Sequence, residues 1–198
     1  WGCEELCASV DGYIRTWRQD NTTGPQAMSN GYLRDSYLIG NECPRFGTGE
    51  AKALITETVR GYDLFIISDC FNHGVTYKMF GKEVPMSPDD HFQDLKRIIG
   101  AVAGKARRIN VIMTMLYEGR QHRRSSRESL DCAVALQELV KMGVTNLITF
   151  DAHDPRVQNA IPLEGFENVI PNYQFIKALI RTIPDLQIDR DHMMIISP

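Results

Sequence analysis

Short apolar runs alternate with helix-forming segments along this chain, and that alternation limits the folds open to it more than any other feature. Residues 63–68 and 109–116 have the length and apolar composition of buried strands, and residues 146–150 predict a third strand. Apolar residues at helical spacing separate these runs, and they predict a last helix over 176–183 before a last strand over 193–196. Alternating strands and helices form a mostly parallel sheet. We therefore predict an α/β fold with a doubly wound, mostly parallel sheet flanked by helices.

The segments around these strands carry their own signals. An amphipathic helix is predicted near the start of the chain, from the helical spacing of Leu6, Val10, Tyr13, Ile14 and Trp17. Residues 19–31 predict a loop, residues 51–59 have strand-like composition, and the glycines and prolines of 70–88 indicate an irregular surface excursion. A helix is predicted to start at Pro88, and another to end near Gly143.

The composition excludes several kinds of protein. The formal net charge is −3, which gives no bulk electrostatic case for nucleic acid, so no such partner is expected. No apolar run approaches the roughly 20 residues of a membrane helix, and no signal peptide is visible in these residues, so no membrane partner is expected. The five cysteines are odd in number and form no C-x-x-C pair, which indicates reduced thiols in a cytoplasmic protein.

The chain's termini bear on its domain organisation. The 198 residues, of which 43% are hydrophobic, suffice for one large domain. The first residue is Trp1 rather than Met, and Pro198 follows directly after an apolar run. We therefore expect the natural polypeptide to be longer, at least at its C-terminal end.

A basic loop follows the second predicted strand, where ligands of parallel sheets bind. It reads Arg120-Gln121-His122-Arg123-Arg124, with Arg127 close behind. Arginine holds phosphate oxygens in a bidentate fork and stays charged at every working pH, so the cluster suits a polyphosphate or a phosphorylated sugar. The alternative is a solvated loop that pairs loosely with Glu118 and Glu128.

Two further segments have side chains suited to ligands. Asp151-Ala152-His153-Asp154 follows the third strand, and its carboxylates and imidazole suit a divalent metal or a ligand hydroxyl. The alternative is that an aspartate only caps the next helix. The segment 45–50 places Phe46 between small residues, where its ring could meet a planar base or simply pack in a turn. Phosphate-loop, dinucleotide-binding and nucleophile-elbow motifs are absent.

Four segments together resemble the N-terminal domain of the ribose-phosphate pyrophosphokinases, which make phosphoribosyl pyrophosphate. Residues 45–50 and 59–67 resemble the family's R-F-x-x-G-E and V-R-G-x-D-x-[FY]-I-[IV] motifs, and residues 119–124 resemble its loop ending in A-R-Q-D-R-[RK]. Asp151-Ala152-His153 with Gln158 resembles D-L-H-x-x-Q-I-Q, and the closing Ile195-Ile196-Ser197-Pro198 resembles the V-V-S-P that opens the second domain. The resemblance spans roughly residues 45–198, and the shared order and spacing make it specific.

The resemblance implies a phosphoribosyltransferase-like α/β domain, one of two in each subunit of a homo-oligomer. Residues 1–198 would be the single N-terminal, ATP-side domain, and the second domain would start at about residue 195. The implied reaction moves the β,γ-diphosphoryl group of ATP to the C1 hydroxyl of ribose 5-phosphate, with Mg²⁺, for nucleotide biosynthesis. The family's ribose-5-phosphate loop and its catalytic lysine-arginine loop belong to the second domain. No catalytic residue is therefore expected in this chain, and the fragment alone is expected to be inactive.

The same resemblance implies roles for five residues. Arg120 and Gln121 match an Arg-Gln pair that holds ATP, and His153 matches a histidine beside the metal and the nucleotide. Phe46 and Glu50 match residues that reach the adenine site of a neighbouring subunit. The implied ATP-binding set is therefore Phe46, Glu50, Arg120, Gln121 and His153, and His153 is also the implied metal ligand.

Several positions depart from the family pattern. Thr48 stands where the family usually has an acid, and His122 where it usually has Asp. Ala152 replaces Leu, and Asp154 replaces a small residue. These departures leave an alternative open, a non-catalytic regulatory or binding relative with the same fold. A nucleic-acid binder that uses the basic loop is a third alternative, disfavoured by the net charge and by the lack of interleaved aromatic residues.

Overall fold

The structure is a computed structural model that describes residues 2–196. Its helices are α1 (Glu4–Asp20), α2 (Pro88–Val102), α3 (Asp131–Lys141) and α4 (Asn172–Thr182), with short 3-10 helices at Pro25–Met28 and Pro155–Ala160. Its strands are β1 (Asn41–Glu42), β2 (Leu54–Ile55), β3 (Asp63–Ser68), β4 (Thr76–Met79), β5 (Lys82–Pro85), β6 (Arg108–Met113), β7 (Val144–Phe150) and β8 (Gly165–Val169). Ser197 and Pro198, the end of the closing motif, lie outside the described residues.

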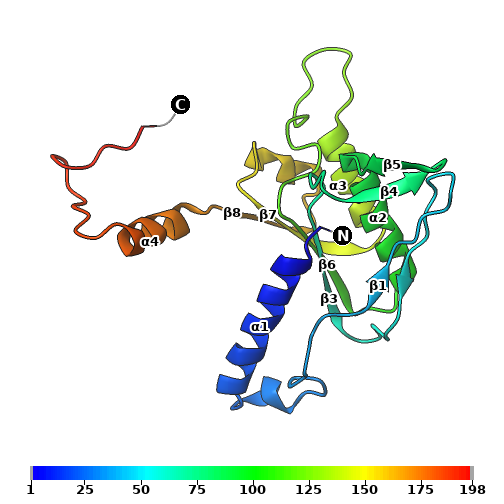
Figure 1. Cartoon of the computed structure of the whole chain (residues 1–198), viewed down its shortest axis with the longest axis horizontal. Coiled ribbons are helices and arrows are strands. Elements are labelled where there is room, and N and C mark those ends of the chain that lie inside the picture. Colours follow the sequence, from blue (N-terminus) through cyan, green and yellow to red (C-terminus); the bar gives the residue numbers. More distant parts are fainter. Residues whose placement is uncertain (1, 197–198) are drawn as a thin grey trace.

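A four-stranded parallel sheet forms the centre of the molecule, in the order β3-β6-β7-β8 (Figure 1). The three strands expected from the apolar runs are β3, β6 and β7. In the register, Ile66 lies opposite Val111, and Val111 lies opposite Leu147. The α/β fold with a parallel sheet flanked by helices is therefore confirmed.

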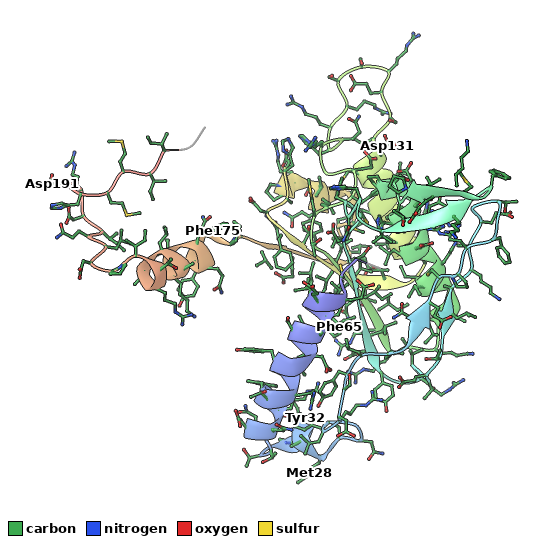
Figure 2. All side chains as sticks on the ribbon, in the orientation of Figure 1. Met28, Tyr32, Phe65, Asp131, Phe175 and Asp191 are labelled. Atoms are coloured by element: carbon green, nitrogen blue, oxygen red, sulfur yellow. The ribbon has the colours of Figure 1, made fainter. Side chains whose placement is uncertain are left out.

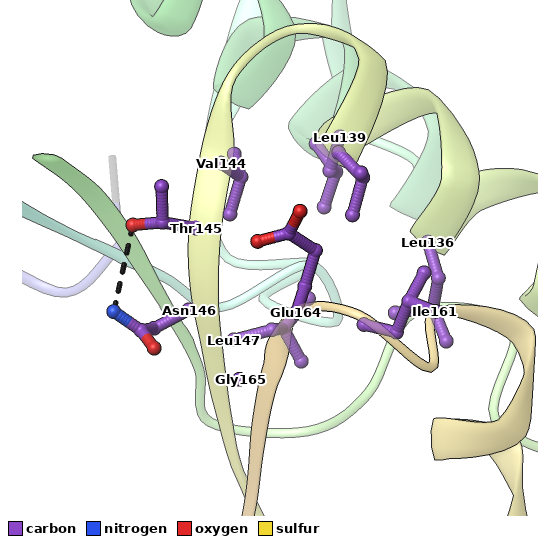
Figure 3. A pocket seen from close by; sticks show the side chains of 10 residues that line it. Leu136, Leu139, Val144, Thr145, Asn146, Leu147, Ile161, Glu164 and Gly165 are labelled. Carbon is purple, nitrogen blue, oxygen red and sulfur yellow. Dashed lines mark hydrogen bonds between the residues drawn. The ribbon is translucent and has the colours of Figure 1, made fainter.

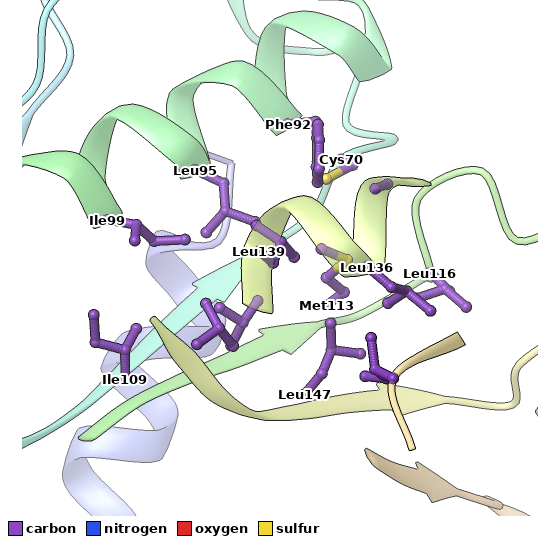
Figure 4. Packing of buried hydrophobic residues seen from close by; sticks show 14 of the residues in the cluster. Cys70, Phe92, Leu95, Ile99, Ile109, Met113, Leu116, Leu136, Leu139 and Leu147 are labelled. Carbon is purple, nitrogen blue, oxygen red and sulfur yellow. The ribbon is translucent and has the colours of Figure 1, made fainter. Parts of the chain in front are cut away.

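Helices α2 and α3 cover one face of this sheet and enclose the core (Figure 4). In α2 the residues at helical spacing are buried, and Phe92, Leu95 and Ile99 are at most 6% exposed. Val111, Met113 and Leu147 meet them from the strands and are almost fully buried. Burial of each such side chain stabilises the fold by about 1.5–3 kcal/mol relative to exposure.

The start of α2 is fixed by a capping box. The Ser87 hydroxyl accepts from the Asp90 backbone N–H at 3.1 Å, and the Asp90 carboxylate accepts from the Ser87 backbone N–H at 2.9 Å. Pro88 follows the cap, where its missing N–H costs nothing. This local chemistry explains why the helix starts where the sequence predicts.

The opposite face of the sheet is less covered. Phe65 points out from β3 and is 56% exposed (Figure 2). Helix α1 is confirmed where its apolar spacing predicts it, but Asp11 is its one buried residue. Asp11 accepts from the backbone N–H of Tyr37 at 2.6 Å, and Asn72 donates to the Gly2 carbonyl at 3.0 Å.

One strand prediction is confirmed only in part, and another is wrong. Within the strand-like stretch 51–59, Leu54 and Ile55 pair in a two-residue ladder with β1, and Ala51 forms an isolated bridge with Arg45. The apolar run 193–196 forms no strand, and its Ile195 and Ile196 are each 81% exposed. This run and α4 lie apart from the body, so nothing there offers a strand edge for pairing (Figure 1).

Two elements escape the sequence prediction. Residues 70–88, expected to be irregular, contain the β4–β5 hairpin, whose turn has Phe80 at φ 49° and Gly81 at φ 78°. Two successive positive φ values are typical of the tight hairpin turn that glycine favours. Strand β8 is the second omission, because its Gly165-Phe166-Glu167-Asn168-Val169 sequence has no continuous apolar run.

No helix among the described residues is both long enough and apolar enough to cross a membrane.

Candidate functional site

The basic loop and the Asp151–Asp154 turn lie at the same edge of the sheet. Strands β6 and β7 pair in parallel, with Met113 opposite Thr149, so the chain leaves both strands side by side. The loop that follows β6 then rises as a long protrusion before α3 begins (Figure 1). The position agrees with the general rule that ligands of such sheets bind beyond the carboxyl ends of the strands.

The base of the loop is packed against the first turns of α2. The Tyr117 ring stacks on Phe92 with the ring centroids 4.2 Å apart, and the Tyr117 hydroxyl donates to the Asp89 carboxylate at 2.6 Å. Burial, together with Asp89, raises the pKa of Tyr117 well above its ordinary value. Burial and the charges of Asp131 and Asp89 likewise raise the pKa of Glu118. The loop therefore begins from a fixed point.

Gln121 closes the neck of the loop. Its side-chain Nε2 donates to the Ser129 carbonyl at 2.6 Å, and its backbone carbonyl accepts from the Cys132 N–H at 3.3 Å. These bonds join the two ends of the protrusion. Arg120 is exposed beside them, and in the part of the chain that the structure describes its guanidinium has no hydrogen-bond or ion-pair partner. The Arg120 side chain is therefore available to an anion from solution.

His122 brings the loop to the turn. Its ring centroid lies 5.2 Å from that of His153, and its Nε2 lies 3.4 Å from Oδ2 of Asp154. On its other side, its Nδ1 lies 3.2 Å from the Arg120 carbonyl oxygen. The side chains of His122 and Asp154 are only 14% and 11% exposed, whereas His153 is exposed.

Asp154 is held by its own neighbours. The Arg156 guanidinium donates to both carboxylate oxygens, at 2.9 Å from Nε and 2.5 Å from Nη2, and the Arg156 backbone N–H donates at 2.9 Å. These bonds hold the pKa of Asp154 well below its usual range. Asp154 also caps the following 3-10 helix, so the capping alternative accounts for part of its role.

The turn itself is tied to β8. The backbone N–H of Asp151 donates to the Val169 carbonyl at 3.0 Å, and that of Ala152 donates to the Asn168 side chain at 2.9 Å. Asp151 adopts a left-handed conformation, with φ 47°. The strand absent from the prediction therefore helps to orient the residues that precede His153.

Phe46 and Glu50 lie in a separate turn. The Phe46 N–H donates to the Glu50 carbonyl at 2.7 Å, and the Phe46 ring is 53% exposed. The Thr48 hydroxyl donates to the Glu50 carboxylate at 2.9 Å. This turn is held from below by Arg45, which pairs with the buried Asp94 of α2 at 2.7 Å. The position of the turn therefore depends on a buried ion pair.

The described residues contain no group of three or more His, Cys, Asp or Glu side chains arranged to hold a metal ion. A small apolar recess lies elsewhere, between α3 and β7, with the Glu164 carboxylate beside it (Figure 3). It lies at the start of β7 and β8, lined by Leu139, Val144 and Gly165, and it is too narrow to admit water. The polar sheet edge is therefore the better candidate site.

Comparison with known proteins decides the family. A model of the N-terminal domain of ribose phosphate pyrophosphokinase matches residues 29–143, more than half of the chain. The chain belongs to the ribose-phosphate pyrophosphokinase family. Its resemblance in the sequence motifs is thereby confirmed.

The relatives are distant and longer than this chain. The ribose-phosphate pyrophosphokinase of Corynebacterium ammoniagenes is 29% identical over 129 residues, which are 63% of this chain and 36% of that protein. That of Maricaulis maris is 25% identical over 166 residues, which are 83% of this chain and 47% of the relative. The matches therefore span less than half of these relatives' lengths.

A solved structure shares the fold. The phosphoribosylpyrophosphate synthetase from Mycobacterium smegmatis superposes with a TM-score of 0.61 at 18% identity, over 75% of this chain and 45% of that one. This likeness supports the same α/β arrangement of the sheet and its helices.

The site residues expected of a pyrophosphokinase fall into two groups. Arg120 and Gln121 meet His153 at one sheet edge, through His122. Phe46 and Glu50 do not join them, and among the described residues no hydrogen bond, ion pair or ring contact links the two groups. Roles in ATP binding and in holding a metal stay predictions for all five residues.

Two side-chain contacts near the candidate site residues were not predicted from the sequence. His122 and Asp154 were treated as departures from the pyrophosphokinase pattern, and their contact depends on long-range pairing of strands that no local motif reveals. Asp94 had a local signal, because it lies between Phe92 and Leu95 on the buried side of α2. A charged residue at such a position needs a partner, which here is Arg45.

Proposed function

We propose that this chain is the ATP-side half of a ribose-phosphate diphosphokinase, which transfers diphosphate from ATP to ribose 5-phosphate in the cytoplasm. The product would be phosphoribosyl pyrophosphate for nucleotide biosynthesis. Family membership supports the reaction class. The observation that carries the proposal is the contact of His122 with His153, which joins the basic loop to the turn at the sheet edge.

The chemistry of the side chains suits this role. Transfer of phosphoryl-type groups depends on positioning and charge neutralisation more than on covalent participation of the protein. The unpaired Arg120 guanidinium would hold phosphate oxygens, and Gln121 keeps a free amide oxygen beside it for a ligand donor. The neck bond from Gln121 to Ser129 keeps these two residues in place before the nucleotide arrives.

Magnesium fits this edge only as part of a metal–nucleotide complex. Mg²⁺ prefers oxygen ligands and usually keeps several waters while it binds phosphates, and the described residues provide no protein cage for it. His153 would contact the complex, and the metal would supply charge neutralisation at the phosphate oxygens. The protein's own part is to orient the nucleotide through Arg120 and His153.

The adenine end of ATP would lie across a subunit interface. Phe46 is 53% exposed and is therefore free to meet a base bound to a neighbouring copy. The Glu50 carboxylate lies in the same exposed turn and would accept from a base amino group. This arrangement requires a homo-oligomer, in which the turn of one subunit faces the sheet edge of the next.

The test uses the complete natural protein that contains this chain. We expect AMP to form from ATP when ribose 5-phosphate and Mg²⁺ are both present, and not when either is omitted. Product analysis by chromatography and phosphorus NMR measures this directly. Nucleotide turnover at the same rate without the sugar phosphate would contradict the proposal.

A non-catalytic relative is the second candidate. The observation in its favour is the bond from Thr48 to Glu50, which occupies the acid expected at the adenine. Such a relative would bind ATP in calorimetry and yet form no AMP under any combination of sugar phosphate and metal. A Thr48→Asp variant that gains turnover would support this second reading.

A further inference from the structure

The loop and the turn are joined through a single side chain. His122 contacts His153 ring to ring and meets Asp154 at 3.4 Å. Among the described residues, no other hydrogen bond, ion pair or ring contact connects residues 117–130 with residues 151–154. The relative position of Arg120 and His153 therefore depends on the contacts that His122 makes with the turn.

His122 is well built for such a link. It follows Arg120 and Gln121 directly, and its Nδ1 faces the Arg120 carbonyl oxygen at 3.2 Å, which orients the ring. Its side chain is 14% exposed, in contrast to the exposed arginines on the rest of the loop. Because the His122 ring is largely buried and is oriented by the Arg120 carbonyl, a fixed position of this ring also restricts the backbone of Arg120 and Gln121.

Asp154 is the anchor of the pair. Three donor atoms of Arg156 hold its carboxylate, and it caps the 3-10 helix that follows. The carboxylate therefore has several hydrogen bonds besides its contact with His122, and Asp154 directly follows His153. Residues that both depart from the family pattern are thus in contact, so the two departures act as one unit.

We propose that His122 is a positioning residue, which holds the Arg120-Gln121 segment against His153 by pairing with Asp154. The consequence for nucleotide binding rests on the proposed function, whereas the link itself does not. The pair of His122 and Asp154 sets the distance between the Arg120 guanidinium and the His153 imidazole, which would both contact the nucleotide.

The first measurement is hydrogen exchange of the amides of residues 119–122 in the complete protein without nucleotide. We expect His122→Ala and Asp154→Ala each to speed exchange about 5- to 10-fold, as expected for a coupled pair. The double variant should be no faster than either single one. The His122→Gln variant, whose amide can still donate to Asp154, should recover most of the protection. The exposed Arg124→Ala serves as the matched control and should change nothing.

The second measurement is steady-state kinetics with ATP. We expect His122→Ala to raise the KM for ATP about 10-fold while kcat changes less than about 3-fold, and His122→Gln to restore KM. Effects of the two single variants that add in the double variant would overturn the link. A raised KM with unchanged exchange would also overturn it, because His122 would then contact the nucleotide itself. Complete absence of turnover would contradict the proposed function, while the exchange data would still decide the link.

Discussion

Arg120 and Arg127 lie in the same basic loop but differ in how they are held. Arg120 stands at the neck that Gln121 closes, beside the contact of His122 with His153. Arg127 lies on the protruding part of the loop and is exposed, as are its neighbours. Position rather than charge should therefore decide which arginine binds a nucleotide.

This difference predicts unequal effects of two matched substitutions. Arg120→Ala should weaken ATP binding about 10- to 100-fold, because charge-assisted hydrogen bonds contribute about 1.5–3 kcal/mol. Arg127→Ala should change the Kd less than about 2-fold, as a screened surface charge does. Calorimetric titration of the complete protein with ATP and Mg²⁺ measures both. Equal small losses would mean that the whole cluster is a solvated loop.

Two buried thiols predict a pH dependence of stability. Burial raises the pKa of Cys70 and of Cys132 to about 11, from an ordinary value of 9.0. The fold favours the neutral thiols, so their contribution is fully present below pH 9 and is lost as the pH rises from 9 towards 11. Urea unfolding between pH 8 and pH 11 should show this loss. The Cys70→Ala/Cys132→Ala variant is the control, and an equally steep loss in it would assign the effect to other groups.

At the residue scale, motifs locate the ligand-binding candidates better than they describe their surroundings. The sequence alone places Arg120, Gln121 and His153 after two neighbouring parallel strands, and the structure has them at one sheet edge. It does not reveal that Asp154 pairs with His122, because that contact depends on the stagger of β6 against β7. Local patterns carry no information about such a register.

At the scale of elements, helix α2 supports the turn that holds Phe46 and Glu50. Asp94 on α2 pairs with Arg45 at 2.7 Å and with Arg97 at 2.6 Å, and the side chains of Asp94 and Arg45 are 8% and 9% exposed. The Arg45 guanidinium also lies 4.7 Å from the centroid of the Tyr77 ring of β4. One buried carboxylate therefore connects the helix, the turn and the hairpin.

Removal of this carboxylate should be costly. Asp94→Ala leaves Arg45 buried without its partner, so the free energy of unfolding should fall by about 3–5 kcal/mol. The matched control is Glu138→Ala, which breaks the more exposed pair of Lys96 with Glu138 and should cost at most about 1 kcal/mol. Urea unfolding followed by circular dichroism measures both. Similar small losses would show that the buried pair contributes no more than a surface pair.

Elements were predictable where one kind of signal dominates. Strands β3, β6 and β7 are rich in apolar residues, because at least one face of each strand packs against the core, and helix α2 has a capping box as well as helical spacing. The β4–β5 hairpin was hidden by Pro85 and two glycines, which indicate loops when read singly. Strand β8 is an edge strand, whose Glu167 and Asn168 break the apolar run.

At the scale of the whole molecule, the exposed surface is large for the mass. The chain has 13839 Å² of accessible surface at 22.5 kDa, whereas a compact monomer of that mass has about 9,500 Å². Helix α4 and the segment after it account for part of the excess, because they stand apart from the body (Figure 1). The run 193–196 belongs to this separate segment, and its Ile195 and Ile196 are each 81% exposed.

Helix α4 shows the same separation in its side chains. None of its residues is buried, and Phe175, Ile176 and Ile180 are 48–64% exposed (Figure 2). Ile176→Asp in the 198-residue chain should therefore leave the free energy of unfolding of the body unchanged within about 0.5 kcal/mol. Leu139→Ala in α3, where the side chain is 0% exposed, should cost about 2–5 kcal/mol. Urea unfolding monitored by circular dichroism compares the two. A loss of stability in the Ile176 variant comparable to that in the Leu139 variant would mean that α4 packs on the sheet in solution, and that Ile176 is part of the core rather than of the surface.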